Sequence, residues 1–407
     1  MSKLAILGGE PAVTEEFPHW PEWGDSERSR LMEVLESGYW GLMSPVIDEW
    51  EERFARLQGA RYATSTANGT IGLVIALQAC GIGPGDEVIV PSYSFMATAS
   101  AVLWVGAIPV FADIQAETFN LDPESARGLI TEKTRAIIPV HIAGCPCDMD
   151  ALKALAEEHD LVLLEDAAQA HGALWNSKGA GTIGAIGSLS FQSSKNLCAG
   201  EGGMLVTDDQ ELWERCVELK NCGRPPDGAE YEHHTLGTNA RMGAFQAAIL
   251  LAQAERFHEQ FTEREKNWSF LRSALAMVPG IDLQERDPRV DCHALHLLIL
   301  RYNPEGFAGL PRETFMAAME AEGVPVRPGY RPLHLEKAFL EDTKRILRDR
   351  PTLDYTTLDL PVTLKVCNET SVWIRQNALL GDTTIHVEQI AEAVRKISQN
   401  AGGLVKA

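Results

Sequence analysis

The stretch Leu161-Val162-Leu163-Leu164-Glu165-Asp166 decides the fold that the sequence predicts. An unbroken apolar run of this length is typical of a central parallel strand that is buried on both faces. Asp166 falls at the carboxyl end of the run, where open α/β sheets bind their ligands. Glu165 competes for that role, but adjacent strand residues face opposite sides of a sheet, and we prefer Asp166. The alternative is that Asp166 only caps a following helix.

Further apolar runs repeat this pattern along the first half of the chain. They lie at residues 86–90, 108–113, 136–140, 188–192 and 203–207. Amphipathic stretches alternate with the runs up to about residue 210. This alternation predicts an α/β fold with a mostly parallel sheet flanked by helices.

The composition beyond residue 242 predicts a second, smaller domain. Residues 242–277 contain one glycine and no proline before the Val278-Pro279-Gly280 turn, which predicts a long helix leaving the large domain. A strand candidate at 296–300 and a helix candidate at 312–322 follow. Because 407 residues exceed what one core usually holds, we expect a large domain at 12–255 and a small domain at 256–407. Residues 1–11 are expected to pack on the small domain.

Charge and composition exclude several classes of protein. The net charge of −21 and the pI near 5.0 argue against a nucleic-acid or anionic-membrane surface. No apolar run is long enough to span a bilayer, and the first residues lack a secretory signal pattern, so we expect a cytoplasmic protein. The eight cysteines are scattered, and the short spacing of Cys145-Pro146-Cys147 is not a zinc-ligand pattern. We expect no metal.

Lys195 is the strongest candidate for chemistry. It follows a β-prone run in Ser190-Phe191-Gln192-Ser193-Ser194-Lys195-Asn196 and precedes the glycine-rich Gly200-Glu201-Gly202-Gly203. A lysine adds to an aldehyde only as the neutral amine, so such a lysine needs a lowered pKa and a fixed position. This pattern points to pyridoxal 5′-phosphate (PLP), whose ring acts as an electron sink. Taken alone, the motif also fits a solvated lysine at the end of a strand.

A phosphate site is predicted where Thr64-Ser65-Thr66-Ala67-Asn68-Gly69-Thr70 opens an apolar helix. Helix N-termini present free N–H groups and a positive dipole end, which bind phosphate. Gly69 would let the backbone approach the phosphate, and Thr70 would add a hydroxyl. Ser190 is a further phosphate candidate. The alternative is an ordinary helix N-cap.

Two aromatic residues are candidates to stack on the cofactor ring. The sequence Pro91-Ser92-Tyr93-Ser94-Phe95 follows a predicted strand, and an aromatic side chain at a strand end can stack on a pyridine ring. Phe95 is our choice and Tyr93 is the alternative. On the other side of the ring, Asp166 can keep the pyridine nitrogen protonated. Gln169 can reach the phenolic oxygen.

Together these motifs resemble the DegT/StrS sugar aminotransferase family of fold-type I PLP enzymes, from about Leu7 almost to the C-terminus. The matching stretches are residues 68–70, 91–97, 165–172, 190–203 and 237–242. The segment Phe17-Pro18-His19-Trp20-Pro21 resembles the cyclitol and 3-amino-5-hydroxybenzoate synthase branch. The resemblance implies a large domain with a mostly parallel seven-stranded sheet and a smaller α+β C-terminal domain.

The resemblance also implies roles for single residues. Lys195 forms the internal aldimine with PLP and acts with Asp166 in catalysis. The remaining cofactor contacts are Gly69, Thr70 and Ser190 at the phosphate, Phe95 on the ring and Gln169 at the phenolic oxygen. Asn239 reaches the phosphate of the neighbouring subunit, which implies a homodimer with shared sites. Its neighbours Thr238 and Ala240 depart from the aromatics frequent in the family. Asn239 could instead cap the following helix.

The substrate side is predicted at Tyr330, Arg331 and His334, in a loop that borders the acceptor pocket in the family. Arg331 and Arg375 could hold a donor carboxylate. The implied reaction is ping-pong transamination from glutamate or glutamine to a keto sugar or keto cyclitol. The alternatives are a PLP-dependent lyase or dehydratase, an activity like 3-amino-5-hydroxybenzoate synthase, and a non-catalytic regulatory protein.

Overall fold

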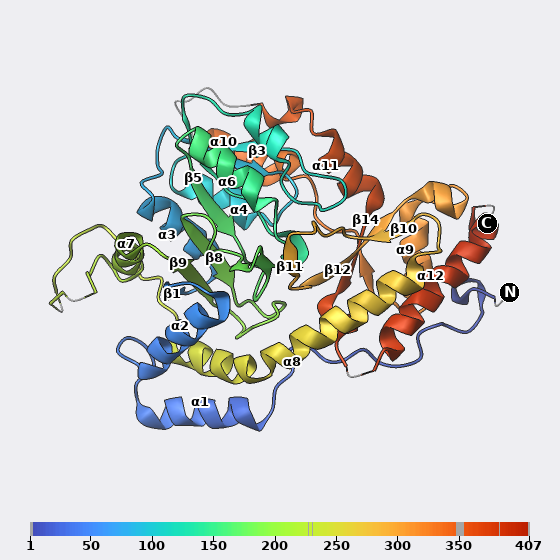
Figure 1. The fold of residues 1–407 in the computed structure, drawn as a ribbon, viewed down its shortest axis with the longest axis horizontal. Helices are drawn as coiled ribbons and strands as arrows, with labels where there is room; N and C mark the ends of the chain where they lie inside the picture. Colours follow the sequence, from blue (N-terminus) through green and yellow to red (C-terminus); the bar gives the residue numbers. More distant parts are fainter. Residues whose placement is uncertain (1–2, 227, 230, 347–353, 382, 406–407) are drawn as a thin grey trace.

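The computed structural model describes residues 3–226, 228–229, 231–346, 354–381 and 383–405. Its large sheet has seven strands in the order β1-β9-β8-β5-β4-β2-β3 (Figure 1). The strands are β1 (Tyr62–Thr66), β2 (Glu87–Pro91), β3 (Ile108–Ala112), β4 (Thr134–Ile137), β5 (Val162–Asp166), β8 (Ile186–Ser190) and β9 (Gly203–Thr207). Only β9 runs against its neighbours. The predicted α/β fold with a mostly parallel sheet is confirmed.

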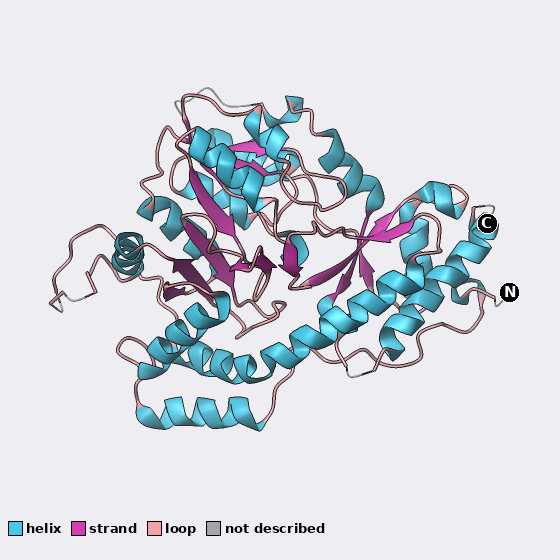
Figure 2. Ribbon diagram, viewed as in Figure 1, coloured by secondary structure: helices cyan, strands magenta, loops and turns pink. Residues whose placement is uncertain are grey.

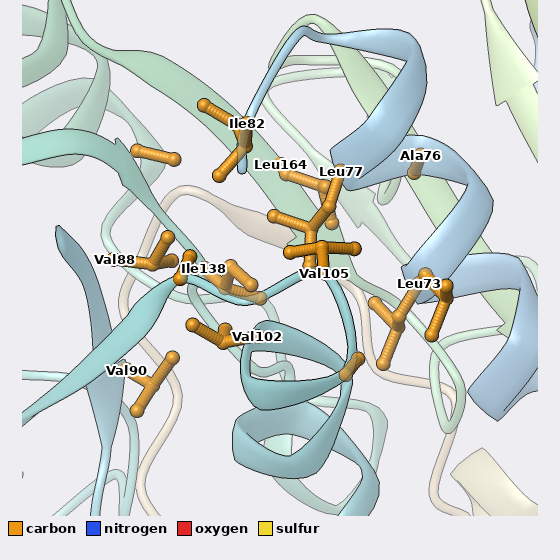
Figure 3. Close-up of a cluster of buried hydrophobic side chains, with 14 of the residues drawn as sticks. Leu73, Ala76, Leu77, Ile82, Val88, Val90, Val102, Val105, Ile138 and Leu164 are labelled. Atoms are coloured by element: carbon orange, nitrogen blue, oxygen red, sulfur yellow. The ribbon is translucent and has the colours of Figure 1, made fainter. Parts of the chain in front are cut away.

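Helices cover both faces of this sheet because its strands are apolar on both sides. Leu164 of β5 faces α3 (Gly69–Ala79) and α4 (Ala97–Trp104), in the core shown in Figure 3. Leu163, the preceding residue of β5, faces α6 (Met149–Glu158) on the other side. Such two-sided burial is the reason that β5 reads as a continuous apolar run.

The helix α8 (Ala244–Leu275) carries the chain from the large sheet to a second sheet, which Figure 2 shows apart from the first. That sheet is antiparallel, with the order β10-β12-β14-β13. Its strands are β10 (Ile281–Leu283), β12 (Leu297–Tyr302), β13 (Val326–Arg327) and β14 (Ser371–Arg375). Together with α9 (Arg312–Ala321) and α12 (Ile385–Leu404) it encloses a separate core. The domain boundary that we propose at 255/256 lies within α8.

The remaining elements surround these two sheets. The helices are α1 (Asp25–Ser37), α2 (Pro45–Gln58), α5 (Pro123–Arg127), α7 (Gln210–Lys220), α10 (Lys337–Ile346) and α11 (Pro361–Lys365). A small three-stranded sheet is formed by β6 (Leu174–Trp175), β7 (Lys178–Gly179) and β11 (Val290–Cys292). The short helical turns are η1 (Ala5–Leu7), η2 (Ile142–Gly144), η3 (Pro304–Phe307), η4 (Leu333–Leu335), η5 (Tyr355–Thr357), η6 (Val366–Thr370) and η7 (Gln376–Leu379).

A buried carboxylate fixes the first residues to the second core. Glu322, which follows α9, accepts hydrogen bonds from the backbone N–H groups of Ala5 at 2.8 Å and Ala12 at 2.9 Å. Lys396 of α12 pairs with the same carboxylate at 2.7 Å and also bonds to the carbonyl oxygen of Glu10. Because Glu322 is fully buried and paired, this contact is a specific anchor rather than a surface salt bridge.

The described residues contain neither a helix that could span a membrane nor a cluster of metal ligands. No helix among them combines the length and the apolar character needed to cross a membrane. Within the same ranges, no cluster of three or more His, Cys, Asp or Glu side chains has the arrangement of a metal site.

Candidate active site

A cavity of about 1290 Å³ opens where the carboxyl ends of the large-sheet strands meet the second sheet. All of the predicted cofactor contacts line it, namely Gly69, Thr70, Phe95, Asp166, Gln169, Ser190, Lys195 and Asn239. These residues come from loops far apart in the sequence, and the fold brings them together as parallel α/β sheets commonly do.

Asp166 ends β5 with its side chain almost fully buried. Its carboxylate accepts hydrogen bonds from the hydroxyl of Thr98 at 2.7 Å and from the backbone N–H of Ala168 at 3.2 Å. Burial raises the pKa of Asp166, and the hydrogen bond from Thr98 opposes that rise. No helix starts directly after β5, where a turn and the short strand β6 follow, so the helix-cap alternative does not apply. A fixed carboxylate at this depth suits a protonated ring nitrogen.

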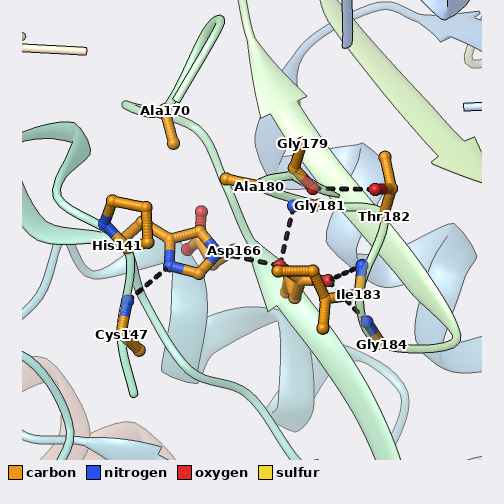
Figure 4. Close-up of polar contacts among 12 residues, drawn as sticks. His141, Cys147, Asp166, Ala170, Gly179, Ala180, Gly181, Thr182, Ile183 and Gly184 are labelled. Carbon is orange, nitrogen blue, oxygen red and sulfur yellow. Dashed lines mark hydrogen bonds and ion pairs between the residues drawn. The ribbon is translucent and has the colours of Figure 1, made fainter. Parts of the chain in front are cut away.

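Glu165, the competing carboxylate, does not line the cavity, and it is hydrogen-bonded to the loop residues Gly181, Ile183 and Gly184, which Figure 4 labels. Its oxygens accept hydrogen bonds from the backbone amides of Gly181, Ile183 and Gly184. The ring of His141 lies 2.9 Å from the same carboxylate through Nε2. Because Nδ1 of His141 accepts from the N–H of Cys147, Nε2 carries the hydrogen and donates it to Glu165. The pair therefore fixes the loop beside β5.

Lys195 lies in the turn after β8, where its backbone N–H bonds to the carbonyl oxygen of Gln192 at 2.8 Å. Its side chain is partly buried and faces the cavity. Nζ makes no hydrogen bond or ion pair with any residue in the described ranges. Burial lowers the pKa of Lys195 to about 8, although the charge of Asp166 opposes the shift. A sizeable fraction of the amine is therefore neutral near physiological pH, as nucleophilic attack on an aldehyde requires.

The start of α3 forms a cradle for an anion. The side chain of Asn68 caps the helix by accepting from the N–H of Ile71 at 2.9 Å, while Gly69 and Thr70 line the cavity. A Cβ atom at Gly69 would lie only 2.9 Å from Cβ of Ser190, so only glycine allows the helix to approach β8 this closely. A helix N-terminus beside the Ser190 hydroxyl fits a phosphate group. The start of α3 can therefore be capped by Asn68 and bind a phosphate at the same time.

The two aromatic candidates differ in exposure. Phe95 lines the cavity with 60% of its surface exposed, whereas Tyr93 is fully buried. The hydroxyl of Tyr93 lies 2.8 Å from that of Ser371 and accepts a hydrogen bond from the indole N–H of Trp373 at 3.0 Å. Tyr93 is therefore occupied in packing, and Phe95 is the aromatic residue free to contact a ring.

Gln169 lines the cavity and is held at both ends of its amide. Its oxygen accepts from the backbone N–H of Ala143 at 2.7 Å, and its nitrogen donates to the hydroxyl of Tyr330 at 2.9 Å. The second hydrogen of that nitrogen is available for a ligand oxygen. The residues around the cavity thus offer a buried acid, a low-pKa amine, an anion cradle and an amide donor, and this set fits PLP.

Asn239 lines the cavity of its own chain and forms an isolated bridge with Asn221. The N-cap of α8 is Gly243, four residues later. The alternative that Asn239 caps this helix is therefore wrong.

Of the predicted substrate residues, the structure brings Tyr330 and Arg375 to the cavity. Arg331 points outward and pairs with Glu336 at 3.3 Å. His334 is buried, with Nδ1 2.6 Å from the hydroxyl of Ser92. The reason is η4, which turns the chain into the core directly after Tyr330. Neither Arg331 nor His334 contributes to the cavity of this single chain.

Several cavity residues were not selected as site residues by sequence reasoning. The segment 17–21 forms one wall, held by hydrogen bonds from Asn377 to the carbonyl oxygen of Pro18 and from Trp20 to that of Ser193. His19 lies between these two anchors. The second sheet adds His296, Leu297 and Trp373, next to Arg375, which the sequence had already suggested as a carboxylate ligand. Only the apolar–polar alternation around residue 373 could have indicated that this strand faces a site.

The model of the DegT/DnrJ/EryC1/StrS aminotransferase family matches residues 21–375. The chain belongs to this family. A Streptoalloteichus tenebrarius protein with the provisional name L-glutamine:3-amino-2,3-dideoxy-scyllo-inosose aminotransferase is 38% identical over 99% of both chains. The L-glutamine:2-deoxy-scyllo-inosose aminotransferase of Streptomyces fradiae is 36% identical over 99% of both chains. The crystal structure of 3-amino-5-hydroxybenzoic acid synthase superposes with a TM-score of 0.85 at 35% identity, covering 95% of this chain and 100% of that one.

Membership in the DegT/DnrJ/EryC1/StrS family confirms the resemblance that the motifs predicted. This chain is an aminotransferase, and its cofactor is PLP. The lyase and regulatory alternatives are disfavoured by the same finding.

Proposed function

We propose that this chain transfers the amino group of L-glutamine to a keto cyclitol by a ping-pong mechanism. The observation that carries the proposal is the Lys195 amine, whose pKa is lowered to about 8 in a cavity that it shares with Asp166. Relatives that act on glutamine and keto cyclitols are similar over nearly the whole chain, which supports this donor and this acceptor.

In this mechanism each residue has a defined task. PLP, when bound, supplies an aldehyde for the substrate amine and a ring that withdraws electrons from the substrate Cα. Lys195 would hold the cofactor, and its Nζ, when free, would remove the proton from the donor Cα. Asp166, oriented by Thr98, holds a proton at the ring nitrogen. The N-terminus of α3 and Ser190 hold the phosphate.

The acceptor is tested by direct amination assays. The purified holoenzyme is incubated with L-glutamine and either scyllo-inosose or 2-deoxy-scyllo-inosose, and the amino cyclitol is measured by mass spectrometry. The Lys195→Ala variant is the control and should give no product. Formation of 3-amino-5-hydroxybenzoate from its precursor, without amination of either inosose, would favour the alternative that the similar synthase structure suggests.

We further propose that the active unit is a homodimer with shared sites. Large apolar side chains are exposed close to the cavity and in the segments that flank α1, as an uncovered subunit interface would be. They include Trp23, Trp40, Met43, Phe95 and Trp104. Asn239 is our candidate to reach the phosphate of the partner, although it also borders the cavity of its own chain.

Mixing two inactive variants tests the sharing. Lys195→Ala chains are combined with Asn239→Asp chains, and heterodimers are isolated with two different affinity tags. If sites are shared, each heterodimer has one intact site and one site with both defects. The isolated heterodimers should then have up to about half of wild-type activity, and the unfractionated random mixture up to about a quarter. Heterodimers without activity, or full activity of Asn239→Asp alone, would refute the shared site.

A further inference from the structure

Strand β14 presents one face to the cavity and the other to the core of the second sheet. Val372 and Ile374 are buried in that core. Because successive strand residues point to opposite faces, Ser371, Trp373 and Arg375 share the other face. Trp373 and Arg375 both line the cavity, so the direction in which Arg375 points is set by the strand itself.

Neighbouring aromatic residues hold this strand in place. The hydroxyl of Tyr93 contacts both Ser371 and Trp373, at 2.8 and 3.0 Å. The ring of Tyr330 packs edge-on against Trp373, with 4.6 Å between the ring centres. Gly329 leaves room for these contacts, since a Cβ atom there would lie 2.7 Å from the Tyr93 hydroxyl. Arg375 therefore projects from a rigid support, which a precise binding site requires.

The residues after Arg375 are fixed as well. The amide oxygen of Gln376 accepts a hydrogen bond from Nε of the buried Arg264 at 2.8 Å. Asn377 donates to the carbonyl oxygen of Pro18, at the other wall of the cavity. Although its backbone is held on both sides, the guanidinium of Arg375 makes no hydrogen bond or ion pair with any residue that the structure describes.

The cavity therefore contains one arginine with free donors. Among its described lining residues, Lys195 and Arg375 are the only lysine and arginine side chains, and Lys195 is assigned to the cofactor aldehyde. The rival arginine, Arg331, is outside the cavity and paired with Glu336. A guanidinium fork with unused N–H groups matches the two oxygens of a carboxylate.

We propose that Arg375 binds the α-carboxylate of the amino-acid donor. The inference rests on the proposed function, because glutamine carries a carboxylate and a keto cyclitol does not. Arg375 thus acts in the donor half of the reaction and contributes little to the acceptor half. One cavity can then accept a charged amino acid and an uncharged ring in turn, because Arg375 binds the carboxylate of the amino acid and makes no such contact with the ring.

Measuring the donor half-reaction alone distinguishes carboxylate binding by Arg375 from a purely structural role. Holoenzyme in the PLP form is mixed with L-glutamine, and the loss of the yellow colour is followed by stopped flow. In Arg375→Gln, kcat/KM of this step should fall by about 100-fold, mainly through KM, because two charge-assisted hydrogen bonds are lost. Arg375→Lys keeps the charge but not the fork and should fall by roughly 10-fold. Arg327→Gln is the matched control, since Arg327 pairs with Trp373 in the same sheet and bonds to Glu320 outside the cavity.

Two analogues of glutamine, one without the carboxylate and one without the amine, provide the second comparison. The step with 4-aminobutanamide, which is glutamine without its carboxylate, should be slow in the wild type and unchanged in Arg375→Gln. Binding of glutaramate, which is glutamine without its amine, is measured by calorimetry and should weaken at least about 10-fold in Arg375→Gln. This measurement requires no turnover.

Three results would overturn the proposal. They are an unchanged glutamine step in Arg375→Gln, an equal loss with 4-aminobutanamide, and a loss in Arg331→Gln instead. The donor step needs no acceptor, so a protein that reacts with glutamine but aminates no keto cyclitol would refute the proposed acceptor and leave the Arg375 assignment standing. If no amino acid bleaches the wild-type enzyme, both the donor and the role of Arg375 are wrong.

Discussion

Replacing Lys195 with methionine should stabilise the PLP-free protein at pH 7. Burial lowers the pKa of Lys195 from its usual 10.5 to about 8, and each unit corresponds to about 1.4 kcal/mol. The charged lysine therefore destabilises the folded state by roughly 3 kcal/mol. Because the side chain is partly exposed to the cavity, we expect a gain of about 2 kcal/mol on removing it.

The sign follows from proton binding. The folded state holds the lysine proton less tightly than the unfolded chain, so the destabilisation is fully present below pH 8. It shrinks as the pH rises from 8 to 10.5 and vanishes above. The gain from Lys195→Met attributable to charge should therefore fall below about 1 kcal/mol at pH 10.

The assay is urea unfolding of the PLP-free proteins at pH 7 and pH 10, at equal protomer concentration. Lys178→Met, at an exposed lysine in β7, is the control and should change stability little at either pH. An extra apolar contribution of methionine would not depend on pH, so the difference between the two pH values is diagnostic. Equal stability of Lys195→Met and wild type at pH 7, or a gain that is as large at pH 10 as at pH 7, would refute the reasoning.

Three further outcomes are expected. Asp166→Asn should remain folded but lose turnover by several orders of magnitude, because it cannot keep the ring nitrogen protonated; near-normal steady-state rates would exclude this role. Gly69→Ala should weaken PLP binding, measured by fluorescence titration of the PLP-free protein, because its Cβ would lie 2.9 Å from that of Ser190; an unchanged affinity would mean that the helix start does not hold the phosphate. Covalent capture of PLP by Lys195 should accelerate with pH and level off near pH 8, since only the neutral amine reacts; a rate that keeps rising towards pH 10 would contradict the lowered pKa.

The cofactor end of the cavity was accessible to sequence reasoning because its signals are local. Asp166 ends an apolar run, Gly69 opens an apolar helix and Lys195 precedes a glycine-rich turn. Each feature occupies a few consecutive residues whose backbone geometry follows from their composition. The parallel order of the strands then brings the three together, as open α/β sheets generally do.

The substrate end could not be predicted in the same way because it depends on contacts between distant segments. Tyr330, Arg331 and His334 look equivalent in the sequence, but η4 turns His334 towards Ser92 in the core and leaves Arg331 outside. Arg375 enters the cavity only because β14 pairs with β12 and lies against Tyr93. These relations span up to 280 residues and leave no local pattern.

The anchor at Glu322 has a consequence for synthesis of the chain on the ribosome. Residues 17–21, which wall the cavity, emerge early, but the contacts that fix the segments around them require Glu322, Asn377 and Lys396. At the usual rate of translation, those residues follow only after tens of seconds. The phosphate cradle and Lys195 belong to the portion completed first. A nascent chain should therefore form the cofactor-binding end of the cavity before the wall at residues 17–21 is fixed. The part of the cavity that selects the substrate would then form last.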